Sequence, residues 1–119
     1  MDNIQDWIDK LRSTKKLIIV EGKKDKKALS ELQIKNIITL NKPLYEIVEF
    51  VAENGKECIL LLDLDKEGKK LYSRLKSSLQ KHGVKIDDRF REFLFKHTKL
   101  SNIEGLTKYI KNELVEWNL

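Results

Sequence analysis

The chain has 119 residues, of which 40% are hydrophobic and 36% are charged, as is usual for a globular protein. A chain of this length holds one hydrophobic core but no separate catalytic module. We therefore expect a single domain over residues 1–119, with an N-terminal helix at 3–12, a core at about 16–106 and a C-terminal helix at about 106–117.

The charge balance is moderately basic, with 24 Lys and Arg residues against 19 Asp and Glu residues. This balance fits a polyanionic partner such as nucleic acid. It also fits a solvated Lys/Glu-rich surface of the kind found in proteins from hot environments, which the charge balance alone favours. No apolar stretch approaches the roughly 20 residues of a membrane span, and the N-terminus lacks the pattern of a signal peptide. Because Cys58 is the single cysteine, we expect a buried thiol, a cytoplasmic setting and no membrane partner.

Hydrophobic spacing predicts alternating helices and strands. Helical spacing places helices at 3–12, from about Asp25, from Pro43 and at about 66–82. Short apolar runs predict strands at 17–20, 37–40 and 59–62, and residues 92–96 are expected to form the fourth strand. Residues 84–86 are also compatible with a short extended segment, and 87–91 with a turn or short helix. The final helix is expected to bury one face, made of Leu106, Tyr109, Ile110, Leu114 and Trp117.

This alternation predicts an α/β fold in which about four mostly parallel strands carry helices on both faces. A strand order of 2-1-3-4 would make the strands at 17–20 and 59–62 neighbours. Trp7 is expected to pack in the core, with base stacking as the alternative.

Two of the predicted strands end in acidic residues. Glu21 follows the first strand, and Asp63, Asp65 and Glu67 follow the apolar run at 59–62. Ligand sites of open α/β sheets lie outside the carboxyl ends of the strands, where these acids would converge. Each acid also has a structural interpretation: Asp65 as a helix N-cap, Asp63 as a turn residue and Glu21 as a surface acid.

The segments Val20-Glu21-Gly22, with Asp25 close behind, and Asp63-Leu64-Asp65 before a Gly-containing helix start resemble the Toprim domain of topoisomerases, bacterial-type primases and several nucleases. The resemblance extends from about residue 16 to residue 106 and implies a three-layer, Rossmann-like Toprim fold. The chain looks most like small stand-alone Toprim proteins of archaea, and it is similar to the catalytic domain of the bacterial maturase of 5S ribosomal RNA.

The resemblance implies that Glu21 performs general acid/base catalysis and that Asp63 and Asp65 hold Mg²⁺, with Mn²⁺ as an alternative. Glu67 falls at the third acidic position that some topoisomerases use for a second metal, although an acid at a helix start is favourable in any case. Basic residues near the acids are candidates for gripping nucleic-acid phosphates, with an ordinary solvated surface as the alternative. They are Lys23, Lys24, Lys66, Lys69 and Lys70.

Several residues depart from the family pattern. Leu64 stands where the family usually has proline, and Glu104 matches a late family glutamate only loosely. Asp25 is expected to cap the following helix. His82 and His97 have no second ligand at zinc spacing.

Three functions compete. The leading hypothesis is a Mg²⁺-dependent phosphodiester enzyme, expected to be a nuclease acting on structured RNA or on DNA, with roles such as RNA processing or DNA repair. The alternative is a non-catalytic nucleic-acid-binding or adaptor module that acts with a partner protein. A phospho-receiver is the third, but Gly22 and Lys23 stand where its second acid belongs, and only Lys96 could supply its late strand-end lysine.

Overall fold

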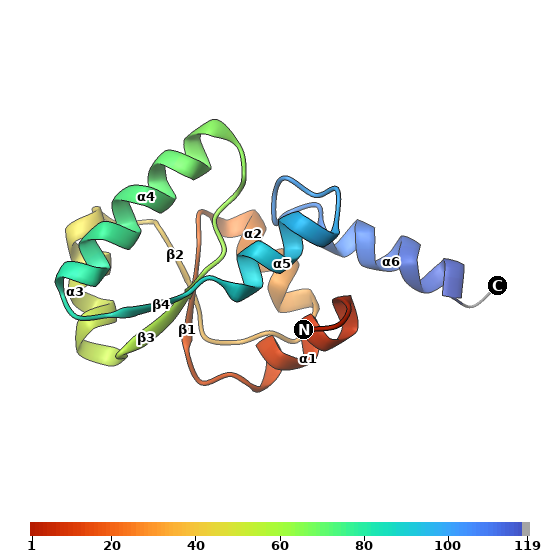
Figure 1. The fold of residues 1–119 in the computed structure, drawn as a ribbon, viewed down its shortest axis with the longest axis horizontal. Helices are drawn as coiled ribbons and strands as arrows, with labels where there is room; N and C mark the ends of the chain where they lie inside the picture. Colours follow the sequence, from red (N-terminus) through yellow and green to blue (C-terminus); the bar gives the residue numbers. More distant parts are fainter. Residues whose placement is uncertain (118–119) are drawn as a thin grey trace.

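The computed structural model describes the backbone of residues 1–117 and the side chains of residues 1–112 (Figure 1). Helices and strands alternate along most of the chain, followed by two consecutive helices. In chain order they are α1 (Ile4–Ser13), β1 (Leu17–Val20), α2 (Lys23–Glu31), β2 (Ile37–Thr39), α3 (Leu44–Asn54), β3 (Glu57–Leu60), α4 (Lys66–Lys81), β4 (Lys85–Asp87), α5 (Arg89–His97) and α6 (Leu106–Trp117). Among the described helices, none combines the length and apolar character needed to cross a membrane.

The four strands form one all-parallel sheet in the order β2-β1-β3-β4, which confirms the predicted order 2-1-3-4. Ile19 of β1 is aligned with Leu60 of β3 and with Ile38 of β2. Each parallel connection requires a crossover, and α2, α3 and α4 provide the three crossovers. Consequently, β1 and β3 are the two central strands, and their carboxyl ends lie side by side.

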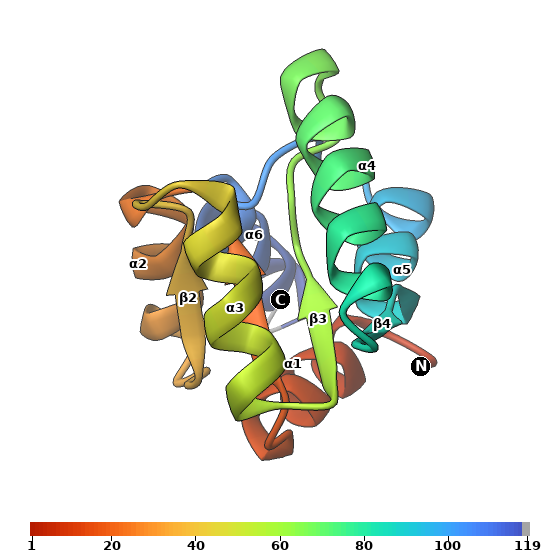
Figure 2. The same cartoon turned by 90° about the vertical axis from the view of Figure 1, so that its left-hand side faces the viewer.

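Helices cover both faces of the sheet, which makes the fold a three-layer α/β sandwich (Figure 2). On one face, α3 and α4 pack against alternate strand residues that include Ile19, Cys58 and Leu60. On the other face, α1, α2, α5 and α6 pack against the intervening residues Ile18 and Ile59. Successive side chains of a strand point to opposite faces, so both strands read as continuous apolar runs. Cys58 is fully buried as predicted, and burial raises the pKa of its thiol to about 12.

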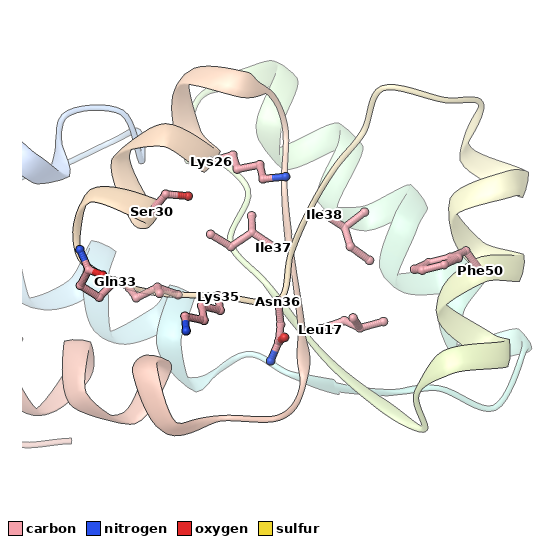
Figure 3. Close-up of a pocket in the computed structure, with 10 residues that line it drawn as sticks. Leu17, Lys26, Ser30, Gln33, Lys35, Asn36, Ile37, Ile38 and Phe50 are labelled. Carbon is pink, nitrogen blue, oxygen red and sulfur yellow. The ribbon is translucent and has the colours of Figure 1, made fainter.

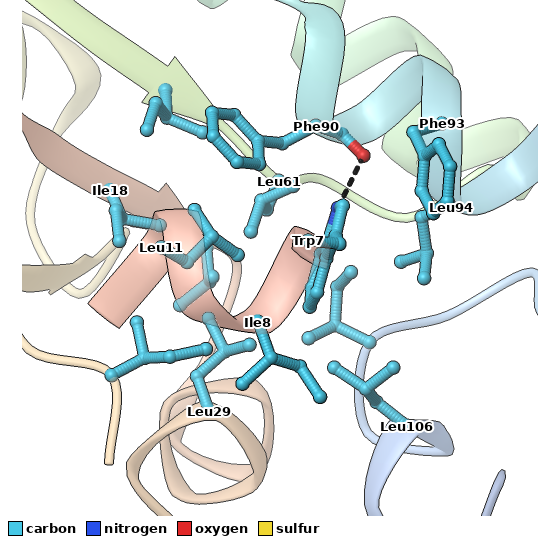
Figure 4. Close-up of a cluster of buried hydrophobic side chains, with 14 of the residues drawn as sticks. Trp7, Ile8, Leu11, Ile18, Leu29, Leu61, Phe90, Phe93, Leu94 and Leu106 are labelled. Carbon is cyan, nitrogen blue, oxygen red and sulfur yellow. Dashed lines mark hydrogen bonds between the residues drawn. The ribbon is translucent and has the colours of Figure 1, made fainter. Parts of the chain in front are cut away.

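Trp7 joins α1 to α5 inside the core (Figure 4). Its side chain is 0% exposed, and its Nε1 donates a hydrogen bond of 2.9 Å to the carbonyl oxygen of Phe90. The Phe90 ring packs edge-on against the indole, with 6.5 Å between the ring centroids. Because the indole is buried and its one donor is satisfied, Trp7 is a packing residue and is not available to stack on a nucleic-acid base.

The prediction of the fourth strand was wrong. Residues 92–96 lie within helix α5, and the fourth strand is β4, which includes the short extended candidate at 84–86 in part. The physical reason is the spacing of Phe90, Phe93 and Leu94, which places all three on one buried helical face. Lys96 is exposed on the same helix, so it cannot serve as the strand-end lysine of a phospho-receiver.

Smaller differences concern the ends of the helices. Helix α2 begins at Lys23 rather than near Asp25, and Pro43 is the N-cap of α3 rather than its first helical residue. In α6, Leu106 and Ile110 are buried as predicted, whereas the side chains of Leu114 and Trp117 lie outside the described residues. None of these differences moves the strands that carry the acidic residues.

Candidate functional site

Glu21 and Asp63 are neighbours because they follow adjacent strands of the sheet. Glu21 comes directly after β1, and Asp63 comes after β3 and the buried pair Leu61 and Leu62. The amide of Leu61 donates to the carbonyl of Ile19 at 2.8 Å, which extends the pairing of the two strands toward the acids. The sheet therefore brings together the two acids that the sequence places at its carboxyl edge.

An open pocket of about 530 Å³ lies at this edge. It is lined by Glu21, Gly22, Lys23, Lys24, Asp25, Asp63 and Glu104. Within the described residues, none of the four acids in this pocket forms an ion pair within 4.0 Å. One carboxylate oxygen of Glu21, Oε1, is buried and has no hydrogen-bond partner. Four acids without an ion-pair partner among the described residues, together with one orphaned oxygen, make this pocket a place where a cation would be stabilised.

Three acids of the pocket, Glu21, Asp25 and Asp63, have raised pKa values and so resist ionisation. Burial raises the pKa of Glu21, and the nearby negative charge of Asp63 raises it further. Burial also raises the pKa of Asp63, with Asp25 and Asp65 adding repulsion, although a hydrogen bond from Ile103 lowers it in part. The pKa of Asp25 is raised by burial and by Glu104, against a hydrogen bond from Gly22. The raised pKa values show that the carboxylates share one electrostatic environment.

Asp25 and Asp65 both have structural roles at helix starts. Oδ2 of Asp25 accepts the amide of Gly22 at 3.0 Å, so the predicted capping role of Asp25 is confirmed. Asp65 is the N-cap of α4, and its Oδ1 accepts the amide of Gly68 at 2.7 Å. This leaves the second oxygen of Asp65 available to a ligand, since an N-cap carboxylate uses only one of its oxygens in this bond.

Gly68 allows α4 to begin directly against Asp63. A Cβ atom at this position would lie 2.2 Å from the carbonyl oxygen of Asp63 and 3.0 Å from Oδ1 of Asp65. The first of these contacts is with backbone and cannot be relieved by turning a side chain. Only glycine permits this approach, which fixes the two aspartates relative to each other.

The loop at 98–105 is tied to the same site by two hydrogen bonds. The amide of Leu64 donates to the carbonyl of Ser101 at 2.8 Å, and the amide of Ile103 donates to Oδ1 of Asp63 at 3.0 Å. In Figure 2 this loop, drawn in blue, passes beside the chain that leaves β3. Proline at position 64, which the Toprim pattern usually has, could not donate the first bond. The amide of Leu64 thus helps to hold the loop that carries Glu104 to the pocket.

Arg91 of α5 holds the backbone of the segment that carries Asp63. Its Nε donates to the carbonyl of Leu62 at 3.0 Å, and its Nη2 donates to the carbonyl of Asp63 at 3.2 Å. The guanidinium also lies 4.2 Å from the ring centroid of Tyr72. These contacts hold the backbone of Asp63, so Arg91 is a positioning residue.

The structure separates the remaining predicted site residues into two groups. Lys23 and Lys24 line the acid pocket. Glu67, Lys66, Lys69 and Lys70 are exposed on the first turns of α4, outside the residues that line it. A nucleic acid that contacts both groups would therefore have to extend beyond the pocket and along the start of α4.

The donor set fits a hard divalent cation. Mg²⁺ prefers carboxylate oxygens and usually keeps several water ligands, and the site supplies the carboxylates of Asp63 and Asp65, with the orphaned oxygen of Glu21 beside Asp63. In the described part of the chain, however, no group of three or more acidic, histidine or cysteine side chains is already arranged to hold a metal ion. These side chains would therefore have to rearrange to hold an ion.

Sequence reasoning gave too little weight to Glu104 and missed Arg91. The sequence indicates Glu104 only as a loose match to a late glutamate of the Toprim pattern. Its contact with the pocket comes from a loop whose path no local pattern predicts. For Arg91 the available signal was a single arginine between the aromatic residues Phe90 and Phe93. Such an arginine indicates packing against aromatic rings but does not predict its backbone partners.

Comparisons with known proteins place the chain in a family. Residues 15–88 match the model of the Toprim domain. A UPF0292 protein of Methanocaldococcus jannaschii is 33% identical over 110 residues, which cover 88% of this chain and 86% of the relative. One from Pyrococcus abyssi is 36% identical over 115 residues, covering 92% and 86%. A solved structure of a protein from Aquifex aeolicus aligns with a TM-score of 0.82 at 37% identity, covering 87% of this chain and 98% of that protein.

Proposed function

Because this chain belongs to the Toprim domain family, and within it to the UPF0292 proteins, we propose that it is a Mg²⁺-dependent nuclease acting on structured RNA or on DNA. Toprim domains are in general metal-binding modules of nucleic-acid processing, so the metal and the nucleic acid follow from the family. Cleavage, a role in RNA processing or DNA repair, a cytoplasmic location and likeness to the 5S ribosomal RNA maturase are the finer parts of this proposal.

The observation that carries the proposal is the buried, unpartnered Oε1 of Glu21 beside the carboxylate of Asp63. A carboxyl group in this position has a raised pKa, so it keeps a protonated population at higher pH than an exposed glutamate does. A proton held there suits a general acid.

In the proposed reaction, water adds to the phosphorus atom and loses a proton to solvent, and the bond from phosphorus to the leaving oxygen breaks. Glu21 donates its proton to that oxygen and later regains a proton from solvent. Asp63 and Asp65, with Glu67 as a further candidate, would hold Mg²⁺ or Mn²⁺, which supplies charge stabilisation at the phosphate and lowers the pKa of bound water. Lys23 and Lys24 would bind flanking phosphates at the pocket, and Lys66, Lys69 and Lys70 would bind phosphates along α4.

A non-catalytic nucleic-acid-binding module, working with a partner protein, is the second candidate. The open shape of the pocket and the two lysines that line it support this function as well, because they favour phosphate contact without requiring turnover.

A cleavage assay separates the two functions. The substrates are 5′-labelled structured RNA, single-stranded DNA and duplex DNA, each with Mg²⁺, with Mn²⁺ or with chelator. The proposal expects metal-dependent cleavage of at least one substrate, loss of about 10²-fold or more in Glu21→Gln, and full activity in the exposed control Glu53→Gln. Salt-sensitive binding without cleavage would support the binding module, and cleavage retained by Glu21→Gln would contradict the role of that residue.

A further inference from the structure

At the outer edge of the sheet, β2 has backbone groups that pair with no further strand among the described residues. The carbonyl of Asn36 accepts the amide of Ile18 at 2.8 Å, and the amide of Leu40 donates to the carbonyl of Glu21 at 3.2 Å, so these groups face β1. Backbone groups of successive residues alternate between the two sides of a parallel strand. Those of Ile37 and Thr39 therefore point away from β1, to the side where the sheet has no further strand.

Two pockets run along this edge, with volumes of about 430 and 340 Å³. Both are lined by Lys26, Ile37, Ile38 and Phe50, so they form one continuous groove along the strand, which we name the β2 groove. Figure 3 shows Phe50 of α3 and Ile38 directed toward each other across it. Phe50 is 48% exposed although it is a large apolar side chain. An apolar groove whose floor is a strand edge is suited to an extended peptide.

The charges around the β2 groove indicate what such a peptide carries. The residues that line the groove include three exposed lysines and one acidic residue. The lysines are Lys26, Lys35 and Lys42, and the acid is Glu46. These charges favour acidic side chains in the occupant. They also disfavour a second copy of this chain, because antiparallel pairing of two copies about Ile38 would place Lys35 of one opposite Asn41 of the other and one residue from its Lys42. Nucleic acid would match the lysines but would leave the outward amides and the apolar side chains without partners.

We propose that the β2 groove binds an extended segment of a partner protein, in which acidic and apolar residues alternate, as an added strand of the sheet. The backbone of the segment pairs with Ile37 and Thr39, its apolar side chains contact Ile38 and Phe50, and its acidic side chains meet the lysines. This surface is separate from the acid pocket and does not depend on the proposed nuclease activity.

The test uses a fluorescein-labelled octapeptide that alternates Glu and Val. Saturable binding to the full chain is measured by fluorescence anisotropy, and hydrogen exchange is followed residue by residue by NMR. Binding should slow exchange at the amides of Ile37 and Thr39. The variant Phe50→Ala and the double variant Lys35→Glu/Lys42→Glu should each weaken binding about tenfold. The double variant Lys81→Glu/Lys85→Glu, which removes the same charge from exposed residues of α4 and β4, should bind like the natural chain.

Two control peptides separate strand pairing from simple attraction of charge. A Lys–Val peptide tests the sign of the charge, and a peptide of the same composition with four Glu followed by four Val tests the alternation. The proposal is overturned by equal binding of either control, by no saturable binding, or by exchange that is unchanged at Ile37 and Thr39. It is also overturned if single-stranded DNA or polyuridine displaces the peptide and slows the same amides, or if the chain dimerises through this edge in sedimentation experiments.

Discussion

At the residue scale, Gly68 allows the start of α4, with Asp65, to lie directly against Asp63. A Cβ atom there would overlap the carbonyl of Asp63, and the amide of Gly68 donates to the N-cap carboxylate of Asp65. An exposed glycine inside a helix would normally be a cost of roughly 1 kcal/mol relative to alanine. Here the glycine is buried in the first turn of α4, and its missing side chain allows the close approach.

We therefore predict that Gly68→Ala destabilises the protein by about 1–3 kcal/mol through overpacking and also removes divalent-ion binding, because α4 must move away from Asp63. Urea unfolding and a Mg²⁺ titration followed by calorimetry measure the two effects. Gly83→Ala is the matched control. Its φ of +79° makes alanine strained there, but Gly83 lies at the far end of α4, so stability should fall and ion binding should persist. Intact ion binding in Gly68→Ala would show that the approach of α4 is not required.

The strand ends predicted correctly that Glu21 and Asp63 lie close together, whereas the contact of Glu104, which comes from a loop, was not predicted. Glu21 and Asp63 follow apolar runs that form adjacent central strands, so topology alone brings them together. The contact of Glu104 depends on the hydrogen bond between Leu64 and Ser101, which joins segments far apart in sequence. The local spacing of residues cannot predict such a bond.

At the element scale, the loop at 98–105 is held by the turn that follows β3. The amide of Leu64 is one of the two donors that fix this loop, and it is available because position 64 is not proline. The prediction of a fourth strand at 92–96 was wrong for a related reason. That segment does not include Phe90, whose spacing from Phe93 and Leu94 indicates the helix α5.

We predict that Leu64→Pro frees this loop. Loss of one hydrogen bond should cost about 1 kcal/mol and should speed amide exchange at residues 99–105, as measured by hydrogen–deuterium exchange mass spectrometry. Leu64→Ala keeps the amide and is the matched control for the lost side chain. If the proline and alanine variants exchange alike in this segment, the hydrogen bond to Ser101 does not hold the loop.

At the scale of the whole molecule, an ion-pair cluster joins the ends of three strands away from the acid pocket. Lys16, just before β1, contacts Oδ2 of Asp87 at 2.9 Å and Oε1 of Glu57 at 3.0 Å, and Arg89 contacts the same Oδ2 at 2.9 Å. Asp87 is only 5% exposed. Burial opposes its ionisation, but hydrogen bonds from Arg89 and Lys16 outweigh burial and lower the pKa of Asp87 below its ordinary value.

This cluster predicts a pH dependence of stability. An acid whose pKa is lowered by folding stabilises the folded state above its unfolded pKa, here near 3.8, and that stability is lost as the pH falls further. Asp87→Asn should lower the free energy of unfolding by about 3 kcal/mol at pH 7, and the difference from the natural chain should shrink below about pH 4. Urea unfolding across this range measures it, with the exposed Asp9→Asn as the control. A difference that stays constant down to pH 2 would rule out Asp87 as its source.

The sheet order, the covering of both faces and the site of the acids were all predictable from the apolar runs and the strand-end residues. The β2 groove was not, because its apolar side chains come from β2 and α3 and read in sequence as ordinary core positions. Phe50 is exposed, and the amides of Ile37 and Thr39 point outward, because β2 is an edge strand. That position follows from the strand order of the whole sheet.

The central claim is that Asp63 and Asp65 hold a divalent cation beside Glu21, and Mn²⁺ binding followed by electron paramagnetic resonance tests it most directly. The natural chain should bind Mn²⁺ saturably and release it to competing Mg²⁺. Asp63→Asn should weaken binding about tenfold or more, while Glu53→Gln, which neutralises an exposed acid of α3, should leave it unchanged. Equal Mn²⁺ affinity in the natural chain and in Asp63→Asn would contradict the claim.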